Sequence, residues 1–171
     1  MVRIRWCVPE TLINAGGDNL LWVSTGSHTD FGPAARRHYS DALHLRDGDR
    51  LPNADHLAGV AAECALKAIL LNFLGGFLNR KGRPAHVGAP SKNSYCHLPG
   101  LWDDIGATVH GRRATTFVGL LAQQNPFLDW DVAERYSAGT HITGERVDSH
   151  LRHAHAILEM YEHATITGAL P

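Results

Sequence analysis

The sequence predicts an all-α protein, an up-down bundle of four or five helices behind a short irregular N-terminal extension. Three observations favour this fold. A stretch ending near Asp47 is amphipathic, residues from about 52 to 74 are apolar on nearly every side, and residues 144–167 carry a regular apolar stripe. A helix that is apolar all round has to be enclosed by other helices, so these stretches are expected to pack against one another.

The composition is that of an ordinary globular protein. The 171 residues are 44% hydrophobic and 19% charged, with a formal net charge of −1. One domain is expected over residues 31–171, after an extension over residues 1–30 that we interpret as a loose hairpin. Without an excess of positive charge, attraction to nucleic acid has to come from a local patch. The three cysteines form no CxxC pair, and their odd number favours a reducing, cytoplasmic setting.

The first two helices are predicted from their boundaries. Asp30 is placed to cap the first helix, Pro33 lies near its first position, and Gly48 ends it. The second helix is expected to begin near Pro52 and to end at the Gly75-Gly76 pair. The two helices therefore form a hairpin joined by a short polar turn.

The rest of the chain alternates irregular segments with helices. Residues 75–96 are rich in Gly, Pro and Ser and are expected to form a long loop. A third helix is expected from Pro99, and a fourth from about Arg113 to Gln123. After an irregular connection over residues 124–143, the last helix is expected to run from about Gly144 to Thr167.

Neither a membrane span nor a signal sequence is predicted. The longest apolar run, Ala65–Leu78, is interrupted by Lys67, Asn72 and a glycine pair, so we expect it to be too short to cross a bilayer. In the first thirty residues, polar residues and glycines interrupt the apolar stretch that a signal sequence needs.

One segment of the second helix resembles a family of small helical domains. The run AAECALKAILLNF at 61–73 resembles the A-x-E-x-A-L-K-A-L-L core of the HEPN superfamily. Three further pieces follow the order of that family. They are the YSDA segment at 39–42, the HLPGLWDDI segment at 97–105, and the pair Arg135-Tyr136 before the last helix. The resemblance covers about residues 33–168.

The resemblance implies both an architecture and a set of activities. HEPN domains are four- or five-helix bundles that usually form symmetric dimers. Members act as metal-independent ribonucleases, as toxins paired with a nucleotidyltransferase, or as non-catalytic modules that bind nucleotide or RNA. The resemblance therefore implies a homodimer, with RNA, a nucleotide or a nucleotidyltransferase as partner, and implies no cofactor.

Catalytic members of the family carry an Arg, four to six residues, and then a His. In this pattern the His acts as general base or acid on a ribose 2′-hydroxyl, and the Arg stabilises phosphate charge. Several Arg and His residues in this chain approximate the spacing: Arg37 and His44, Arg50 and His56, Arg135 and His141, Arg146 and His153.

Helical geometry favours Arg146 and His153 as the catalytic pair. The two lie two turns apart on one face of the last helix, and His150 lies between them on the same arc. The sequence departs from the family pattern because Val147, rather than a polar residue, follows the Arg. The alternative interpretation is that all three are solvated or interface residues of an amphipathic helix.

Two other pairs of the resemblance are predicted to be structural. Glu63 precedes Lys67 by four residues, the favourable order for an intrahelical ion pair at a helix or dimer contact. The alternative is that these two residues contact a ligand or RNA. Tyr136 is expected to pack under the end of the bundle, while Arg135 pairs with a carboxylate.

The loop after the second helix is a candidate RNA contact. Between Cys64 and Trp102 the chain has no Asp or Glu, and its basic residues after the second helix are Arg80, Lys81, Arg83 and Lys92. A basic loop of this kind can contact a phosphate backbone with little sequence preference. We assign His150 to the same candidate RNA- or nucleotide-binding set. The alternative is a loop whose charges only keep it solvated.

A metal site is not predicted. His150 and His153 lie near each other on a helix, but His155 points away from both, by about 140° at 100° per residue. Glu159 and His163 have helical spacing, yet a di-metal bundle site needs Glu-x-x-His motifs on paired helices, and the sequence has none. P-loop, dinucleotide-binding and G-x-S-x-G motifs are also missing from the sequence.

Three functional hypotheses follow. The first is a HEPN-like dimer that binds RNA or nucleotide in a toxin–antitoxin or defence setting, with a metal-independent ribonuclease as its catalytic form. The second is a catalytically silent module that docks a nucleotidyltransferase or a similar partner. The third is a structural bundle whose oligomer is its whole purpose.

Overall fold

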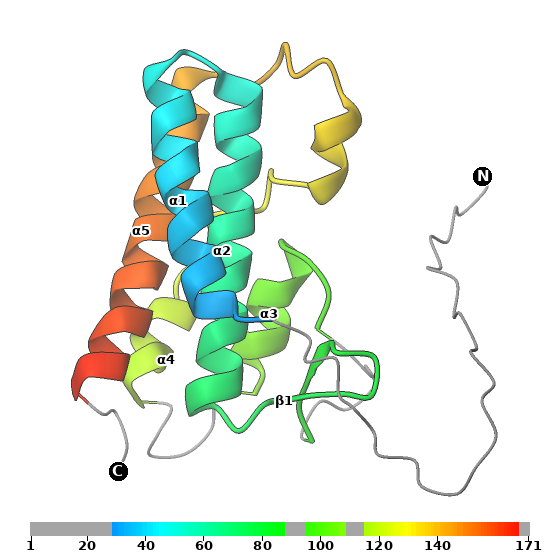
Figure 1. Cartoon of the computed structure of the whole chain (residues 1–171), viewed down its shortest axis with the longest axis vertical. Coiled ribbons are helices and arrows are strands. Elements are labelled where there is room, and N and C mark those ends of the chain that lie inside the picture. The colour runs from blue at the N-terminus through cyan, green and yellow to red at the C-terminus, as the bar shows by residue number, and fades with distance from the viewer. Residues whose placement is uncertain (1–28, 88–94, 109–114, 168–171) are drawn as a thin grey trace, which may run out of the picture.

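A computed structural model of the chain describes residues 29–87, 95–108 and 115–167. Figure 1 shows that these residues form a mostly helical structure, as the sequence predicts. The N-terminal extension, Lys92 and the start of the predicted fourth helix lie outside the described residues. The α-helices are α1 (Phe31–Asp47), α2 (Leu51–Phe73), α3 (Gly100–Gly106), α4 (Thr115–Leu121) and α5 (Gly144–Thr167).

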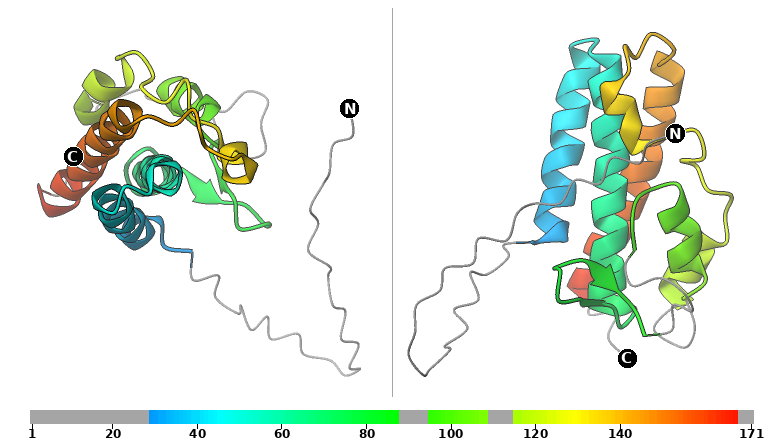
Figure 2. Two further views of the ribbon diagram at one scale, coloured as in Figure 1. Left: turned by 90° about the horizontal axis from the view of Figure 1, so that it is seen from above. Right: turned by 90° about the vertical axis from the view of Figure 1, so that its right-hand side faces the viewer.

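The three long helices α1, α2 and α5 form the body of the structure. They run side by side, and α2 lies against both of the others (Figures 1 and 2). The core-facing part of α2 is rich in alanines, which let neighbouring helices approach closely; Ala54, Ala58, Ala62 and Ala65 are fully buried. The predicted enclosure of this helix by other helices is confirmed.

The length of α2 corrects one expectation. Although its apolar run is interrupted, this helix of 23 residues is long and apolar enough by composition to cross a membrane. Within the structure, 67% of its most apolar stretch is buried against other parts of the chain. A core helix has the same composition.

The helix boundaries match the sequence closely, with one exception in the capping. Asp30 occupies the N-cap position of α1, but its side chain makes no capping hydrogen bond. Gly48 follows the last residue of α1, and its backbone N–H donates to the carbonyl of His44 at 3.1 Å. The predicted turn is therefore confirmed, and α2 begins at Leu51, one residue before the predicted Pro52, whereas the predicted Asp30 cap is wrong.

Part of the segment predicted to be a long loop forms a small β-hairpin. Strands β1 (Phe77–Leu78) and β2 (Pro84–Ala85) pair antiparallel at the foot of α2. The side chain of Asn79 closes the turn between them, because its Oδ1 accepts from the backbone N–H of Lys81 at 2.9 Å and of Arg83 at 3.1 Å.

The connection between α4 and α5 contains a 3-10 helix, η2 (Val132–Tyr136). Tyr136 is 76% exposed and stacks against the guanidinium of Arg135, whose Cζ lies 4.8 Å from the ring centroid. The prediction that Tyr136 packs under the bundle is therefore wrong. Trp130, six residues earlier and 1% exposed, holds the buried aromatic position instead.

Candidate functional site

A buried carboxylate near the start of α2 organises the candidate site. Asp55 is 1% exposed, and its Oδ1 accepts a hydrogen bond of 2.7 Å from Nδ1 of His150 on α5. Its other oxygen, Oδ2, lies 3.1 Å from Nη2 of Arg146 in an ion pair without hydrogen-bond geometry. Since a buried charge needs compensating partners, Asp55 holds two side chains of α5 against α2.

The ring of His150 is clamped on its two edges and on one face. Phe127 stacks on it, with ring centroids 5.0 Å apart, and Oδ1 of Asp55 accepts a hydrogen bond from Nδ1. At the opposite edge, Nε2 lies 3.1 Å from Oδ1 of Asp129. Both ring nitrogens of His150 therefore face a carboxylate oxygen, and the ring is held from two sides.

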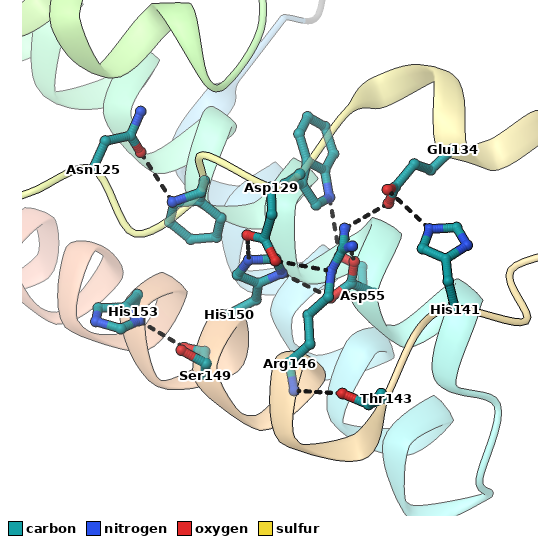
Figure 3. Close-up of polar contacts among 12 residues, drawn as sticks. Asp55, Asn125, Asp129, Glu134, His141, Thr143, Arg146, Ser149, His150 and His153 are labelled. Carbon is teal, nitrogen blue, oxygen red and sulfur yellow. Dashed lines mark hydrogen bonds and ion pairs between the residues drawn. The ribbon is translucent and has the colours of Figure 1, made fainter.

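Arg146 contacts three carboxylates. In addition to Asp55, its Nη2 donates to Oε2 of Glu134 on η2 at 2.7 Å, and its Nε lies 3.5 Å from Oδ2 of Asp129. Burial alone would lower the pKa of Arg146, but the hydrogen bond to Glu134 and the charges of all three carboxylates raise it above its ordinary value. Figure 3 shows the guanidinium among these acids.

The segment before η2 is anchored on both sides of Asp129. Phe127 is fully buried, and Nε1 of Trp130 donates to the backbone carbonyl of Asp55 at 3.1 Å. The indole lies so close to α2 that a Cβ at Gly59 would overlap it. Asn125 fixes the start of the segment, because its Nδ2 donates to the carbonyl of Pro99 at 3.0 Å. The backbone on both sides of Asp129 is thus held in place.

An open pocket of about 320 Å³ gives access to this cluster. It lies over the first turns of α5, where Thr143 Oγ1 accepts from the backbone N–H of Arg146 at 3.3 Å. The pocket is lined by Pro126, Asp129, Thr143, Glu145, Arg146, Ser149 and His150. Its polar lining therefore consists of a guanidinium, an imidazole, two small hydroxyl side chains and two carboxylates.

The predicted pair Arg146 and His153 is not brought together. His153 lines a different, largely apolar pocket between α4 and α5, and its Nδ1 donates to the backbone carbonyl of Ser149 at 2.8 Å. In Figure 3 the side chains of His153 and Arg146 point in different directions, with His150 between them. His150, which the sequence places on the same arc as Arg146 and His153, is buried and paired with the same carboxylate as Arg146.

The basic loop residues lie at the other end of the bundle. Arg80, Lys81 and Arg83 are exposed on the turn between β1 and β2, which follows the C-terminal end of α2. Asp55 and Phe73 are separated by 18 residues of one helix, which is about 27 Å at 1.5 Å per residue. The hairpin and the pocket over α5 are therefore separate surfaces of this chain.

Glu63 and Lys67 form the predicted intrahelical ion pair. Lys67 Nζ donates to Oε1 of Glu63 at 2.6 Å, and both residues are 7% exposed. His97 joins them, with its Nδ1 3.0 Å from Oε2 of Glu63. Burial alone would raise the pKa of Glu63, but the hydrogen bond from His97 and the charge of Lys67 lower it below its ordinary value of 4.5.

The other Arg and His matches give no comparable site. His141 lies on the outer side of Glu134, with its Nε2 3.3 Å from Oε1, while Arg135 stacks on Tyr136. Burial and the charge of Arg135 lower the pKa of His56, whose ring stacks on Trp130. Among the described residues, no group of three His, Cys, Asp or Glu side chains has an arrangement suited to a metal ion.

No family model, curated protein or solved structure matches this chain. The structure therefore establishes a mostly helical protein with packed helices α1, α2 and α5, and the HEPN-type bundle stays a prediction.

Sequence reasoning missed the three acidic partners of Arg146. Asp55 carries a signal that could have been used, because a carboxylate on the apolar side of a core helix needs a buried partner. Asp129 and Glu134 carry no such signal, since they reach Arg146 from an irregular segment and a 3-10 helix without a sequence period.

Proposed function

We propose that this chain is a HEPN-like domain that binds RNA or a nucleotide through a phosphoryl group, at Arg146 and His150. One observation carries the proposal: the fully buried Asp55 contacts both side chains, and both of them line the open pocket. N–H donors held in place by a buried partner are what recognition of a phosphoryl group requires.

The same geometry supports a ribonuclease reaction that needs no metal. Nε2 of His150 would accept the proton of a ribose 2′-hydroxyl, and Asp55 would stabilise the imidazolium that forms. The 2′-oxygen attacks the adjacent phosphorus, the bond to the 5′-oxygen breaks, and the proton that His150 took up passes to that oxygen. The products are a 2′,3′-cyclic phosphate and a free 5′-hydroxyl, while Arg146 stabilises the charge on phosphorus.

A second candidate function has its own supporting observation. Arg146 and His150 are already paired with carboxylates, which outnumber them. A network of this kind locks α5 to α2 without any ligand. It favours a catalytically silent module that docks a nucleotidyltransferase or another partner, and we propose a homodimer for either function, as the family resemblance implies.

Incubation of single-stranded RNA with the protein in EDTA tests the first proposal. We expect binding, and cleavage if the site is catalytic, to be lost in Arg146→Lys and kept in the matched variant Arg152→Lys, which alters an exposed residue of the same helix. Arg146→Lys keeps the positive charge but loses the planar donor array. RNA that stays unbound and intact at high protein concentration would leave the silent module as the function.

The basic hairpin is a second, independent RNA contact in this proposal. Replacing Arg80, Lys81 and Arg83 together by Gln should weaken RNA binding and reduce its dependence on salt, because up to three phosphate contacts are lost. Binding with an unchanged salt dependence would remove the hairpin from the RNA surface and would leave the pocket over α5 as the site.

A further inference from the structure

We propose that the carboxylate of Asp129 occupies the phosphate position of the Arg146–His150 site and has to swing out before a phosphoryl group can bind. The inference rests on the proposed function and adds a means of regulating that site. Asp129 would keep the site closed in the free protein, and any ligand must displace it.

The contacts of Asp129 are those that a bound phosphoryl group would make. Its Oδ1 accepts from Nε2 of His150 at 3.1 Å, and its Oδ2 lies 3.5 Å from Nε of Arg146. Two oxygens of one anion thus face side-chain nitrogens of Arg146 and His150 on neighbouring turns of α5. A phosphoryl group also presents pairs of oxygens to such donors.

Exposure separates Asp129 from the other acids of the cluster. Its side chain is 60% exposed, compared with 1% for Asp55 and 22% for Glu134. An exposed carboxylate regains its hydration when it leaves an ion pair, so such contacts contribute little stability. Of these three acids, Asp129 is the one that a ligand can replace at low cost.

Asp129 also fills the position incompletely. The Nε atom of Arg146 is buried, and none of the described residues accepts a hydrogen bond from it. The Asp129 oxygen at 3.5 Å is in ion-pair contact but outside hydrogen-bond geometry. A buried donor without an acceptor is unfavourable, and a tetrahedral oxyanion in the pocket could approach Nε more closely.

The charge balance favours exchange of one anion for another. The cluster sets the guanidinium of Arg146 and the imidazole of His150 against three carboxylates, those of Asp55, Glu134 and Asp129. Once Asp129 leaves, one of these three negative charges is gone, so an arriving phosphate meets less repulsion in the cluster. With Asp129 in place, the same phosphate is repelled.

The displacement requires only a side-chain movement. Phe127 and Trp130 hold the backbone on either side of Asp129, and Phe127 also covers one face of His150. Rotation about the first side-chain torsion would take the carboxylate from the pocket to solvent while the backbone stays in place. Exposed rotamers exchange within nanoseconds, so the exchange would follow the ligand concentration.

Titration with inorganic phosphate at constant ionic strength tests this proposal by calorimetry. We expect Asp129→Asn to bind phosphate about tenfold more tightly than the unmodified protein, because the competing negative charge is gone. The matched variant Asp41→Asn removes one carboxylate from the exposed surface of α1 and should bind phosphate like the unmodified protein. Equal affinities of all three proteins would overturn the proposal.

A second variant shows where the phosphate binds. Adding Arg146→Lys to Asp129→Asn should abolish the gain in affinity, whereas an unchanged gain would place the anion elsewhere and contradict both the displacement and the proposed site. If RNA binding by the unmodified protein depends on Arg146 but Asp129→Asn gains no phosphate affinity, only the role of Asp129 fails. Thermal unfolding with and without phosphate checks that each variant is folded.

Discussion

Two ionic clusters lie along α2, and they differ in their charge balance. Around Glu63, one buried carboxylate faces Lys67 and His97, and both Glu63 and Lys67 belong to α2. Around Asp55, three carboxylates surround Arg146 and His150, and the members come from four parts of the chain. In the first cluster, two basic side chains contact one carboxylate. In the second, the carboxylates outnumber the basic side chains, and one carboxylate, that of Asp129, is exposed.

The largest effect is expected at the second cluster. Asp55→Ala removes the carboxylate that contacts both Arg146 and His150, and leaves both side chains without their buried partner. We expect the free energy of unfolding to fall by about 3–5 kcal/mol. Urea denaturation followed by circular dichroism measures this change.

Asp129→Ala is the matched control within the same cluster. Because this side chain is 60% exposed, its loss should lower the free energy of unfolding by about 1 kcal/mol or less. Equal losses for the two variants would contradict the distinction between a structural acid and a displaceable one.

The first cluster should show itself in the pH dependence of stability. The pKa of Glu63 is lower in the folded protein than its ordinary value of 4.5. Its contribution is therefore present above that value, and is lost as the pH falls through the folded-state pKa. We expect Glu63→Gln to lower the free energy of unfolding near neutral pH by about 1–3 kcal/mol and to flatten its fall in acid. An acid profile identical to that of the unmodified protein would show that Glu63 is not held by Lys67 and His97.

The packing of Trp130 against α2 belongs to the Asp55 cluster alone, so disturbing it should leave the Glu63 cluster unchanged. Gly59→Ala places a methyl group where the indole lies, so Trp130 must move, and we expect a loss of about 1–3 kcal/mol in the free energy of unfolding. Gly119→Ala on α4 is the control, because a Cβ there meets nothing within 4 Å. In both variants, the free energy of unfolding should fall in acid as it does in the unmodified protein, because the Glu63 cluster is unchanged. If Gly59→Ala is as stable as the control, the packing of Trp130 against α2 is not as described.

The contacts of the Glu63 cluster could be predicted from the sequence more fully than those of the Asp55 cluster, and the reason is physical. Glu63 and Lys67 are four residues apart on one helix, so the period of the helix alone brings them together. The same period predicts α1, α2 and α5 to within a residue or two at most ends. Asp129 and Glu134 meet Arg146 only because Phe127 and Trp130 hold an irregular segment against α2, and such tertiary packing leaves no local pattern.

The structure places His150, rather than the predicted His153, beside Asp55 and Arg146, and the reason is again tertiary packing. On an isolated helix, Arg146, His150 and His153 share an arc, and spacing alone cannot tell which His lies beside the Arg. The buried Asp55 on a different helix decides it, since it contacts Arg146 and His150. His153 instead donates to the backbone carbonyl of Ser149.

Histidine side-chain NMR during titration with a short single-stranded RNA tests the central assignment most directly. The unmodified protein is used, and His150→Gln and His153→Gln serve only to assign the two imidazole signals. We predict that the chemical shifts of the His150 ring nitrogens change as RNA replaces Asp129, while the chemical shifts of the His153 ring nitrogens stay the same. A shift at His153 with a constant His150 signal would contradict the Asp55–His150–Arg146 site.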